Sequence, residues 1–363
     1  MRMKSRKTAW ILAACMSLSL LAGCDNEKQQ IFNEAKKDLE QGSYEYARDE
    51  FQTSVDNGVN PAVSYRGLGI SQLRLGEYEA AIEAFTNGLN AENVNKTLAR
   101  DLYIYRATSR LKAGHTEHAM AACQVLAQKY EMDADSYFLT GKIALKMDAY
   151  DEAAANFEQS YKADSTYNRA IQIYETYVEQ DMEADGTRYL EAVLSTEAKG
   201  ADDLCSRGRV YYYMEDYDNA QKELTEASNQ GSTQALLLLG MVYSAQQDYV
   251  NARSMYQQYV DKKLDTADKA QEETAAPGYN GLALCDIAEG NYDQALENIS
   301  SGITFAEGDE MQSLLFNEIV VYEKKLDFVT AQQKAQSYVD MYPEDEEAAE
   351  ELDFLKSRTG AVS

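Results

Sequence analysis

Small, apolar and aromatic residues recur along the chain in a fixed phrase. The phrase consists of a glycine or polar residue, one spacer, an aromatic residue, two further residues and an alanine. It begins at Gly42, Gly76, Asp148, Glu215, Gln247 and Gly290, with weaker copies at Gly114 and Leu326. Because apolar positions follow helical spacing on both sides of each phrase, the pattern predicts helical hairpins with the phrase at the turn.

The spacing of these phrases predicts one further hairpin. Successive starts differ by 34, 38, 34, 67, 32, 43 and 36 residues. The gap of 67 is close to two periods, so we expect a degenerate copy within residues 167–194. Tyr174, Tyr177, Tyr189 and Leu190 lie there at helical spacing.

Residue sizes alternate around each turn. Small residues such as Gly69, Gly141 and Gly208 lie seven residues before the turn, and large ones such as Phe85 and Phe157 lie four residues after the alanine. This pairing predicts closely crossing helices, with the aromatic of the phrase filling the gap between neighbouring hairpins.

The phrase and its period resemble the tetratricopeptide repeat over residues 28–342. The resemblance implies an all-α fold, a right-handed α-solenoid of about nine helical hairpins. Repeats 1–4 would occupy residues 28–163, repeats 5–7 residues 164–261 and repeats 8–9 residues 279–342. Residues 262–278 form an insertion, either a longer helix or a loop, and are the best candidate hinge. Residues 343–357 are expected to form a capping helix before a tail at 358–363.

Composition agrees with helices and limits the partners. The chain has only 3 Pro, and its formal charge is −27. Without the basic residues of the first 23 positions the net charge becomes −31, and residues 164–363 alone carry −24. Such a surface repels phosphate backbones, which disfavours nucleic acid as a partner.

The N-terminus has the pattern of an export signal. Four basic residues precede an apolar stretch from about Thr8 to Leu21, which is too short for a permanent membrane helix. The segment Leu21-Ala22-Gly23-Cys24 resembles the lipobox of bacterial lipoproteins. The resemblance implies cleavage after residue 23, lipidation of Cys24 and a short tether at 24–30. The protein would then lie outside the cytoplasm on the cytoplasmic membrane, or in the periplasm of a two-membrane cell; a plain secretory signal is the alternative.

Three cysteines of the mature chain, Cys123, Cys205 and Cys285, share no spacing and fall in non-adjacent repeats. We therefore expect small buried core residues rather than a disulfide framework.

The resemblance implies a concave groove lined by the first helix of each repeat. In the first four repeats its usual contact positions hold basic residues: Lys36, Arg66, Arg74, Lys112, Lys142 and Lys146. This pattern favours an acidic peptide or a C-terminal carboxylate as ligand, and the alternative is pairing with neighbouring carboxylates. In the sixth repeat the same register places Arg209, Tyr212 and Tyr213 on the groove, where the alternative is that these are ordinary tyrosines of a Tyr-rich chain.

Enzymatic chemistry has little support. Only His115 and His118 titrate near neutrality; their spacing permits two metal ligands, but no third ligand is evident. We expect no cofactor. The only tryptophan, Trp10, lies in the signal, which disfavours the alternative of a glycan-binding surface lipoprotein. The sequence therefore predicts a membrane-anchored scaffold that binds a protein partner in envelope assembly, secretion or cell-wall processes.

Overall fold

The computed structural model describes residues 26–265, 274–343 and 345–360. Over these residues the chain forms helices joined by short turns, and no strand. It divides into two compact units, unit 1 (Met1–Tyr189) and unit 2 (Leu190–Ser363). Within each unit the helices pack in sequence as hairpins, whose first helix we call A and whose second we call B.

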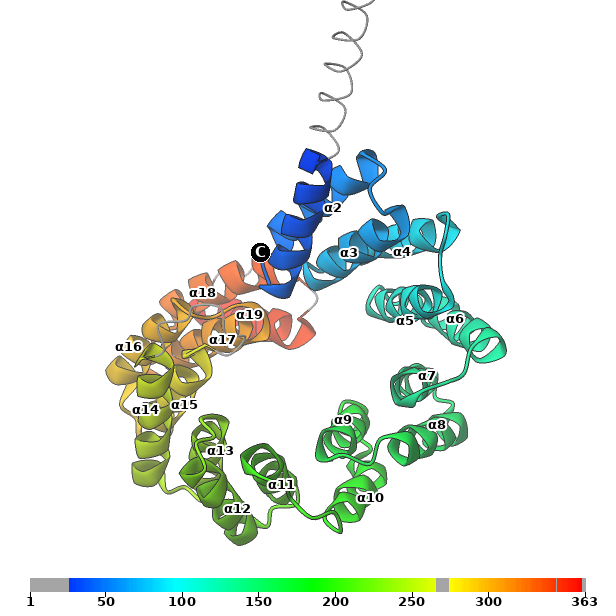
Figure 1. Cartoon of the computed structure of the whole chain (residues 1–363). Helices are drawn as coiled ribbons and strands as arrows, with labels where there is room; N and C mark the ends of the chain where they lie inside the picture. Colours follow the sequence, from blue (N-terminus) through cyan, green and yellow to red (C-terminus); the bar gives the residue numbers. More distant parts are fainter. Residues whose placement is uncertain (1–25, 266–273, 344, 361–363) are drawn as a thin grey trace, which may run out of the picture. The chain divides into compact units, whose positions relative to one another are not determined.

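Unit 1 holds the hairpins that precede the division of the chain (Figure 1). Its A helices are residues 26–40, α3 (Pro61–Arg74), α5 (Lys96–Lys112), α7 (Ala134–Lys146) and α9 (Tyr167–Val178). Its B helices are α2 (Tyr44–Asp56), α4 (Tyr78–Asn90), α6 (Thr116–Lys129) and α8 (Tyr150–Ala163), followed by α10 (Glu183–Val193), in which the division falls.

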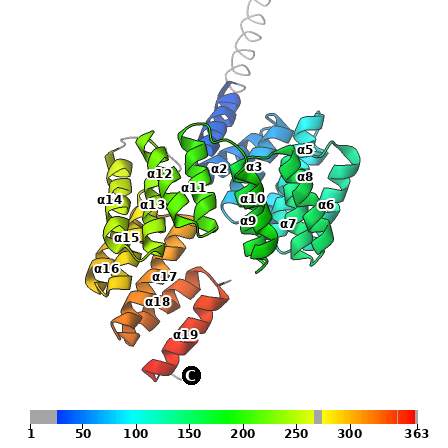
Figure 2. The same ribbon diagram turned by 90° about the horizontal axis from the view of Figure 1, so that it is seen from below.

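Unit 2 continues the same alternation. Its A helices are α11 (Ala201–Tyr213), α13 (Gln234–Ala245), α15 (Ala276–Glu289) and α17 (Gly308–Lys324). Its B helices are α12 (Tyr217–Asn229), α14 (Tyr249–Asp265), α16 (Tyr292–Ile303) and α18 (Phe328–Met341). A last helix, α19 (Glu346–Thr359), packs on α18, and Figure 2 shows α17, α18 and α19 in succession. The described residues thus form nine hairpins and a capping helix, as the periodicity predicts.

Every A–B turn has the same backbone geometry. The first residue of each phrase has a positive φ, at Gly42, Gly76, Gly114, Asp148, Glu215, Gln247, Gly290 and Leu326. At each turn the next amide donates to a carbonyl five residues earlier, as from Glu77 N to Gln72 O at 2.8 Å. This is the Schellman ending of a helix, which satisfies the last carbonyls of helix A. The phrase therefore marks the point where helix A must stop.

The degenerate repeat has the same turn at Asp181. Its φ is 55°, and the Met182 amide donates to the Tyr177 carbonyl at 3.0 Å. Glu183 replaces the aromatic of the phrase and Gly186 replaces its alanine. A Cβ at Gly186 would lie 3.0 Å from the backbone Cα of Tyr174, so the two helices leave no room for a larger residue. The predicted hidden hairpin is confirmed.

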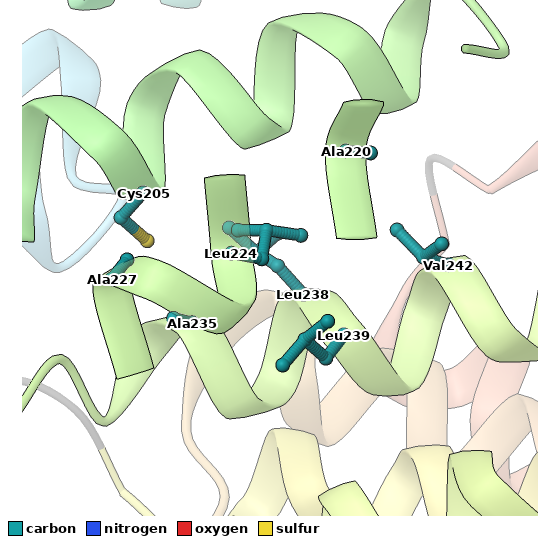
Figure 3. Close-up of a cluster of buried hydrophobic side chains, with 8 residues drawn as sticks. All are labelled: Cys205, Ala220, Leu224, Ala227, Ala235, Leu238, Leu239 and Val242. Carbon is teal, nitrogen blue, oxygen red and sulfur yellow. The ribbon is translucent and has the colours of Figure 1, made fainter. Parts of the chain in front are cut away.

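Glycines of helix A face large side chains of helix B. A Cβ at Gly141 would lie 2.7 Å from the Phe157 ring, and one at Gly208 would lie 2.5 Å from Leu224. Leu224 lies among the buried side chains of unit 2 that Figure 3 shows, which come from α11, α12 and α13. The predicted pairing of small and large residues is confirmed.

The role predicted for the phrase aromatic is wrong in part. Tyr150 is 50% exposed, so it does not fill a gap between hairpins. The large residue four positions after the alanine does: the Phe51 ring would lie 2.3 Å from a Cβ on Gly67 of the next hairpin. The aromatic of the phrase begins helix B, where one side faces water.

Several predicted boundaries move. Residues 26–30 of the expected tether are helical, and residues 262–265 of the expected insertion extend α14. Residues 266–273 lie outside the described residues. Residues 276–278 begin α15 rather than end an insertion, because proline is well tolerated in the first turn of a helix. The capping helix spans Glu346–Thr359, so it takes in two residues of the expected tail.

The three cysteines expected in the core are free and buried, as predicted. Burial raises the pKa of the Cys123 and Cys285 thiols, which favours the unreactive thiol form. In the part of the chain that the structure describes, no helix combines the length and apolar character that a bilayer crossing requires.

Candidate functional site

The A helices of unit 1 form one continuous face. Within this unit α3 contacts α5, α5 contacts α7 and α7 contacts α9, and these four helices lie on the inner side of the arc in Figure 1. We call this surface the A face. It carries the basic positions that the sequence selects.

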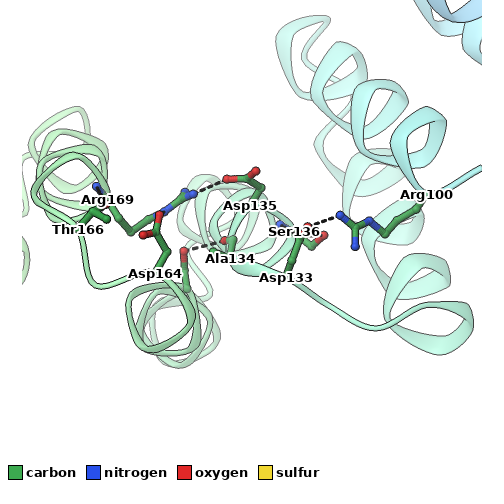
Figure 4. Close-up of polar contacts among 9 residues, drawn as sticks. Arg100, Asp133, Ala134, Asp135, Ser136, Asp164, Thr166 and Arg169 are labelled. Atoms are coloured by element: carbon green, nitrogen blue, oxygen red, sulfur yellow. Dashed lines mark hydrogen bonds and ion pairs between the residues drawn. The ribbon is translucent and has the colours of Figure 1, made fainter. Parts of the chain in front are cut away.

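Ion pairs connect neighbouring helices of the A face. Arg66 on α3 pairs with Asp101 on α5 at 3.0 Å, and Lys142 on α7 pairs with Glu179 at the end of α9 at 2.8 Å. Figure 4 shows two further links, Arg100 to Asp133 and Asp135 to Arg169. Each pair joins residues about one repeat apart in sequence.

The Arg169 side chain is the most buried member of these ion pairs, at 7% exposed. It also lies 3.5 Å from Asp164 and 5.1 Å from the centre of the Phe138 ring. A buried cation needs such partners to offset its desolvation. The ion pairs therefore hold the hairpins in register and leave their members less available to a ligand.

This arrangement separates the predicted basic residues into two groups. Arg66 and Lys142 are paired with carboxylates, as in the alternative drawn from the sequence. The other four are exposed and form no ion pair with any described residue: Lys36, Arg74, Lys112 and Lys146. Arg74 lies 5.9 Å from the centre of the Tyr44 ring.

Arg74, Lys112 and Lys146 occupy equivalent positions. They are the last residues of α3, α5 and α7, so they form a row along one edge of the A face. A cation at this position interacts favourably with the helix dipole. We call these three residues the cation row.

The residues predicted in unit 2 contact one another on α11. The Nη2 and Nε atoms of Arg209 donate to the Tyr213 hydroxyl at 3.0 and 3.2 Å. The Tyr212 ring lies between the rings of Tyr213 and Tyr217, at 5.9 and 6.1 Å. Burial raises the pKa of Tyr212. All three predicted residues are half-buried, so each offers only part of its surface to a ligand.

His115 and His118 lie together, with ring centres 6.2 Å apart. His115 Nε2 lies 2.6 Å from Glu79 Oε1 of the preceding hairpin. The described residues contain no group of three or more His, Cys, Asp or Glu side chains that could hold a metal ion. The lipidation site, Cys24, lies outside the described residues.

Sequence reasoning missed a hollow on the A helices of unit 2. It has a volume of about 420 Å³ and lies between α15, α17 and the start of α19. Asn317 donates to Asn280 at 2.7 Å across α17 and α15, and Gln312 donates to Asp345 at 3.0 Å. Its lining also includes Phe316. Neutral amides carry no charge pattern, so only tertiary contact identifies this site.

The ion pairs of unit 1 were also missed, although the sequence holds a signal for them. Arg66 and Asp101, Arg100 and Asp133, and Asp135 and Arg169 are opposite charges separated by 33 to 35 positions. In a repeat of about 34 residues such a spacing places both partners at the same height on adjacent A helices.

Comparisons with known proteins identify tetratricopeptide repeats in three segments. One tetratricopeptide repeat model matches residues 32–90 and 205–268, and a second matches residues 134–167. These segments cover less than half of the chain. The described chain is accordingly an all-α stack of tetratricopeptide-type hairpins. No match was found among curated proteins.

Solved structures with a similar chain course are remote in sequence. A tetratricopeptide repeat protein from Parabacteroides merdae is 14% identical, with 72% of this chain and 99% of that chain covered and a TM-score of 0.45. The human IFIT1 dimer with PPP-AAAA is 16% identical, covering 93% and 91%, with a TM-score of 0.42. MamA from Desulfovibrio magneticus is 16% identical, covering 46% and 93%, with a TM-score of 0.39. These likenesses support no inference about ligands.

Proposed function

We propose that this chain is a membrane-anchored scaffold outside the cytoplasm that binds an acidic segment of a protein partner on the A face of unit 1. Tetratricopeptide repeats commonly bind proteins and typically have no catalytic activity. The observation that carries the proposal is the cation row, three exposed cations at equivalent positions of adjacent helices. A carboxylate ligand would supply the counter-charges that the described residues do not.

The spacing of the cation row defines the ligand. Packed helices lie about 8–10 Å apart, and an extended peptide advances about 3.3 Å per residue. A peptide that crosses α3, α5 and α7 therefore meets one cation about every third residue. We expect a segment with acidic side chains at that interval.

A peptide titration tests this function. The probe is a fluorescent peptide with Glu at every third residue, and its matched control carries Gln instead. Wild-type protein should bind the Glu peptide, and the combined Arg74→Glu, Lys112→Glu and Lys146→Glu variant should weaken binding at least tenfold, about 1.4 kcal/mol.

The control variant reverses Lys37, Lys96 and Lys162, three exposed lysines of unit 1 outside the cation row. It makes the same change in net charge and should retain binding. Equal loss in both variants would reduce the effect to general repulsion, and retention by the cation-row variant would refute the proposed site.

The membrane anchor is a separate part of the proposal, based on the segment Leu21-Ala22-Gly23-Cys24. Acyl chains on Cys24 would hold the protein at a membrane, since each buried CH₂ contributes about 0.8 kcal/mol. Mass spectrometry of the mature N-terminus should find a lipidated Cys24, and Cys24→Ser should release the protein into the soluble fraction. An unmodified N-terminal cysteine in the wild type would refute the anchor.

The amide-lined hollow of unit 2 favours a second candidate, a glycan ligand. The Asn317–Asn280 bond leaves one amide NH₂ and one amide carbonyl for a ligand, and the Phe316 ring lies beside them. Neighbouring hydroxyls of a sugar both donate and accept, so they match this pair. A glycan array should show a ligand that Asn317→Leu loses and the cation-row variant retains; an array without such a ligand would exclude this candidate.

A further inference from the structure

Unit 1 carries a second group of cations away from the cation row. Tyr103, Arg106 and Arg110 are spaced i, i+3 and i+7 on α5, so they share one side of that helix. Lys129 ends α6, and Tyr130 follows it. We call these five residues the cationic cluster.

Aromatic contacts hold the cationic cluster together. The Arg106 guanidinium lies 5.1 Å from the centre of the Tyr103 ring, and the Lys129 ammonium lies 6.0 Å from the same centre. The Tyr103 and Tyr130 rings are 5.9 Å apart. Two cations therefore border one aromatic ring, with a second ring beside it.

The two arginines have few partners of their own. Arg106 Nε is buried and has no hydrogen-bond partner among the described residues, and its Nη1 reaches only Thr86 Oγ1, at a long 3.4 Å. Arg110 Nη1 donates to the His118 carbonyl at 3.0 Å. Neither forms an ion pair with a described carboxylate. Burial and the neighbouring Arg110 both lower the pKa of Arg106.

This contrasts with other half-buried arginines of the same acidic chain. Arg66, Arg100 and Arg169 in unit 1 and Arg253 in unit 2 all pair with carboxylates. Two adjacent guanidinium groups without a carboxylate repel each other, and partial burial increases that cost. Bound counter-charge would remove it.

We propose that the cationic cluster is a binding site for a doubly charged tetrahedral oxyanion, a phosphate monoester or a sulfate group. Two guanidinium groups offer forked donors that match such oxygens, and Lys129 adds a third positive charge. A single carboxylate would neutralise only one of the three cations. The Tyr103 and Tyr130 rings would flank whatever carries the oxyanion. The site is independent of the function proposed for the A face.

Thermal unfolding and calorimetric titration of the full chain test this site. The probes are inorganic phosphate, inorganic sulfate and O-phosphoserine, each compared with chloride at equal ionic strength. Wild-type protein should show saturable binding of at least one probe, with a rise in Tm that chloride does not reproduce. Arg106→Gln and Arg110→Gln should each raise Kd at least tenfold, and Arg106→Lys should raise it less.

Two further variants separate binding from folding and from general charge. Arg106→Met removes a half-buried unpaired charge, so it should keep or raise Tm without phosphate while losing the response to phosphate. Lys96→Gln combined with Lys162→Gln removes two exposed charges of unit 1 and should leave Kd unchanged. The proposal is overturned if all probes act like chloride, or if Arg106→Gln binds as the wild type does. Preference for O-phosphoserine over both inorganic ions would identify a phosphorylated ligand as the source.

Discussion

Gly240→Ala tests the packing of unit 2, because the Tyr256 ring lies against two glycine backbones. A Cβ on Gly240 would lie 2.4 Å from Tyr256 Cε1, and one on Gly281 would lie 2.5 Å from the same atom. Carbon atoms in contact normally lie 3.5–4.0 Å apart, so the ring would have to move by about 1 Å. Tyr256 is only 4% exposed and cannot turn into solvent without leaving the core.

The expected effect is the balance of two terms. Overpacking of a core costs about 1–3 kcal/mol, and replacing a helix-interior glycine by alanine contributes about 1 kcal/mol of stability. Since a ring held between two backbones yields little, we expect the upper end of the first range. Gly240→Ala should therefore lower the free energy of unfolding by about 1–2 kcal/mol.

Urea unfolding followed by far-UV circular dichroism provides the assay, and a double-mutant cycle provides the sharper result. In a Tyr256→Ala background the ring is absent, so Gly240→Ala should become neutral or stabilising. Gln257→Ala, exposed on α14, is the control and should change stability little. An equal loss from Gly240→Ala in both backgrounds would show that the ring does not restrict this position.

Three further predictions concern single sites. Leu326→Gly should raise stability by about 0.5–1 kcal/mol in thermal unfolding, because Leu326 has a φ of 61° and is 73% exposed; a lower Tm would contradict this. Burial and then Glu351 raise the pKa of Glu323 to about 7, so the folded state holds a proton that the unfolded state loses above about pH 4.5. Stability should fall between about pH 5 and 7, and Glu323→Gln should flatten that slope by about 1 kcal/mol, allowing for solvent screening; an unchanged slope would exclude this carboxyl as its source. Arg169→Ala should cost about 1–3 kcal/mol in urea unfolding, since it removes charged hydrogen bonds and ring contact, whereas Asp135→Asn should cost less because Asp135 is largely exposed; equal costs would place the effect in the Asp135 pair alone.

Periodicity predicted the hairpins well because each turn has a local chemical cause. A helix that ends in a Schellman turn needs a residue with positive φ, and glycine or a polar residue usually fills that position. The turn at Asp181 was predicted only as a gap in the spacing, since Glu183 and Gly186 replace the two residues by which the phrase is recognised. The approach of the Tyr174 backbone, which requires glycine there, is a tertiary contact.

The candidate site could be predicted only in outline. Sequence register selected six basic residues of unit 1, but their roles depend on side chains one repeat away. Arg66 and Lys142 meet Asp101 and Glu179, whereas Arg74 meets no carboxylate among the described residues. The cationic cluster escaped notice because Lys129 comes from α6 and Arg106 from α5, at unrelated positions of the repeat.

The sequence by itself determined the all-helical class, the turn positions, the buried cysteines and the acidic charge, because each depends on local pattern or on composition. Only the tertiary structure decided which charges are neutralised, which helices approach closely enough to require glycine, and where amides form a hollow. Those properties depend on distances between residues about 34 positions apart, and a period specifies that such residues are neighbours without specifying which of their atoms meet.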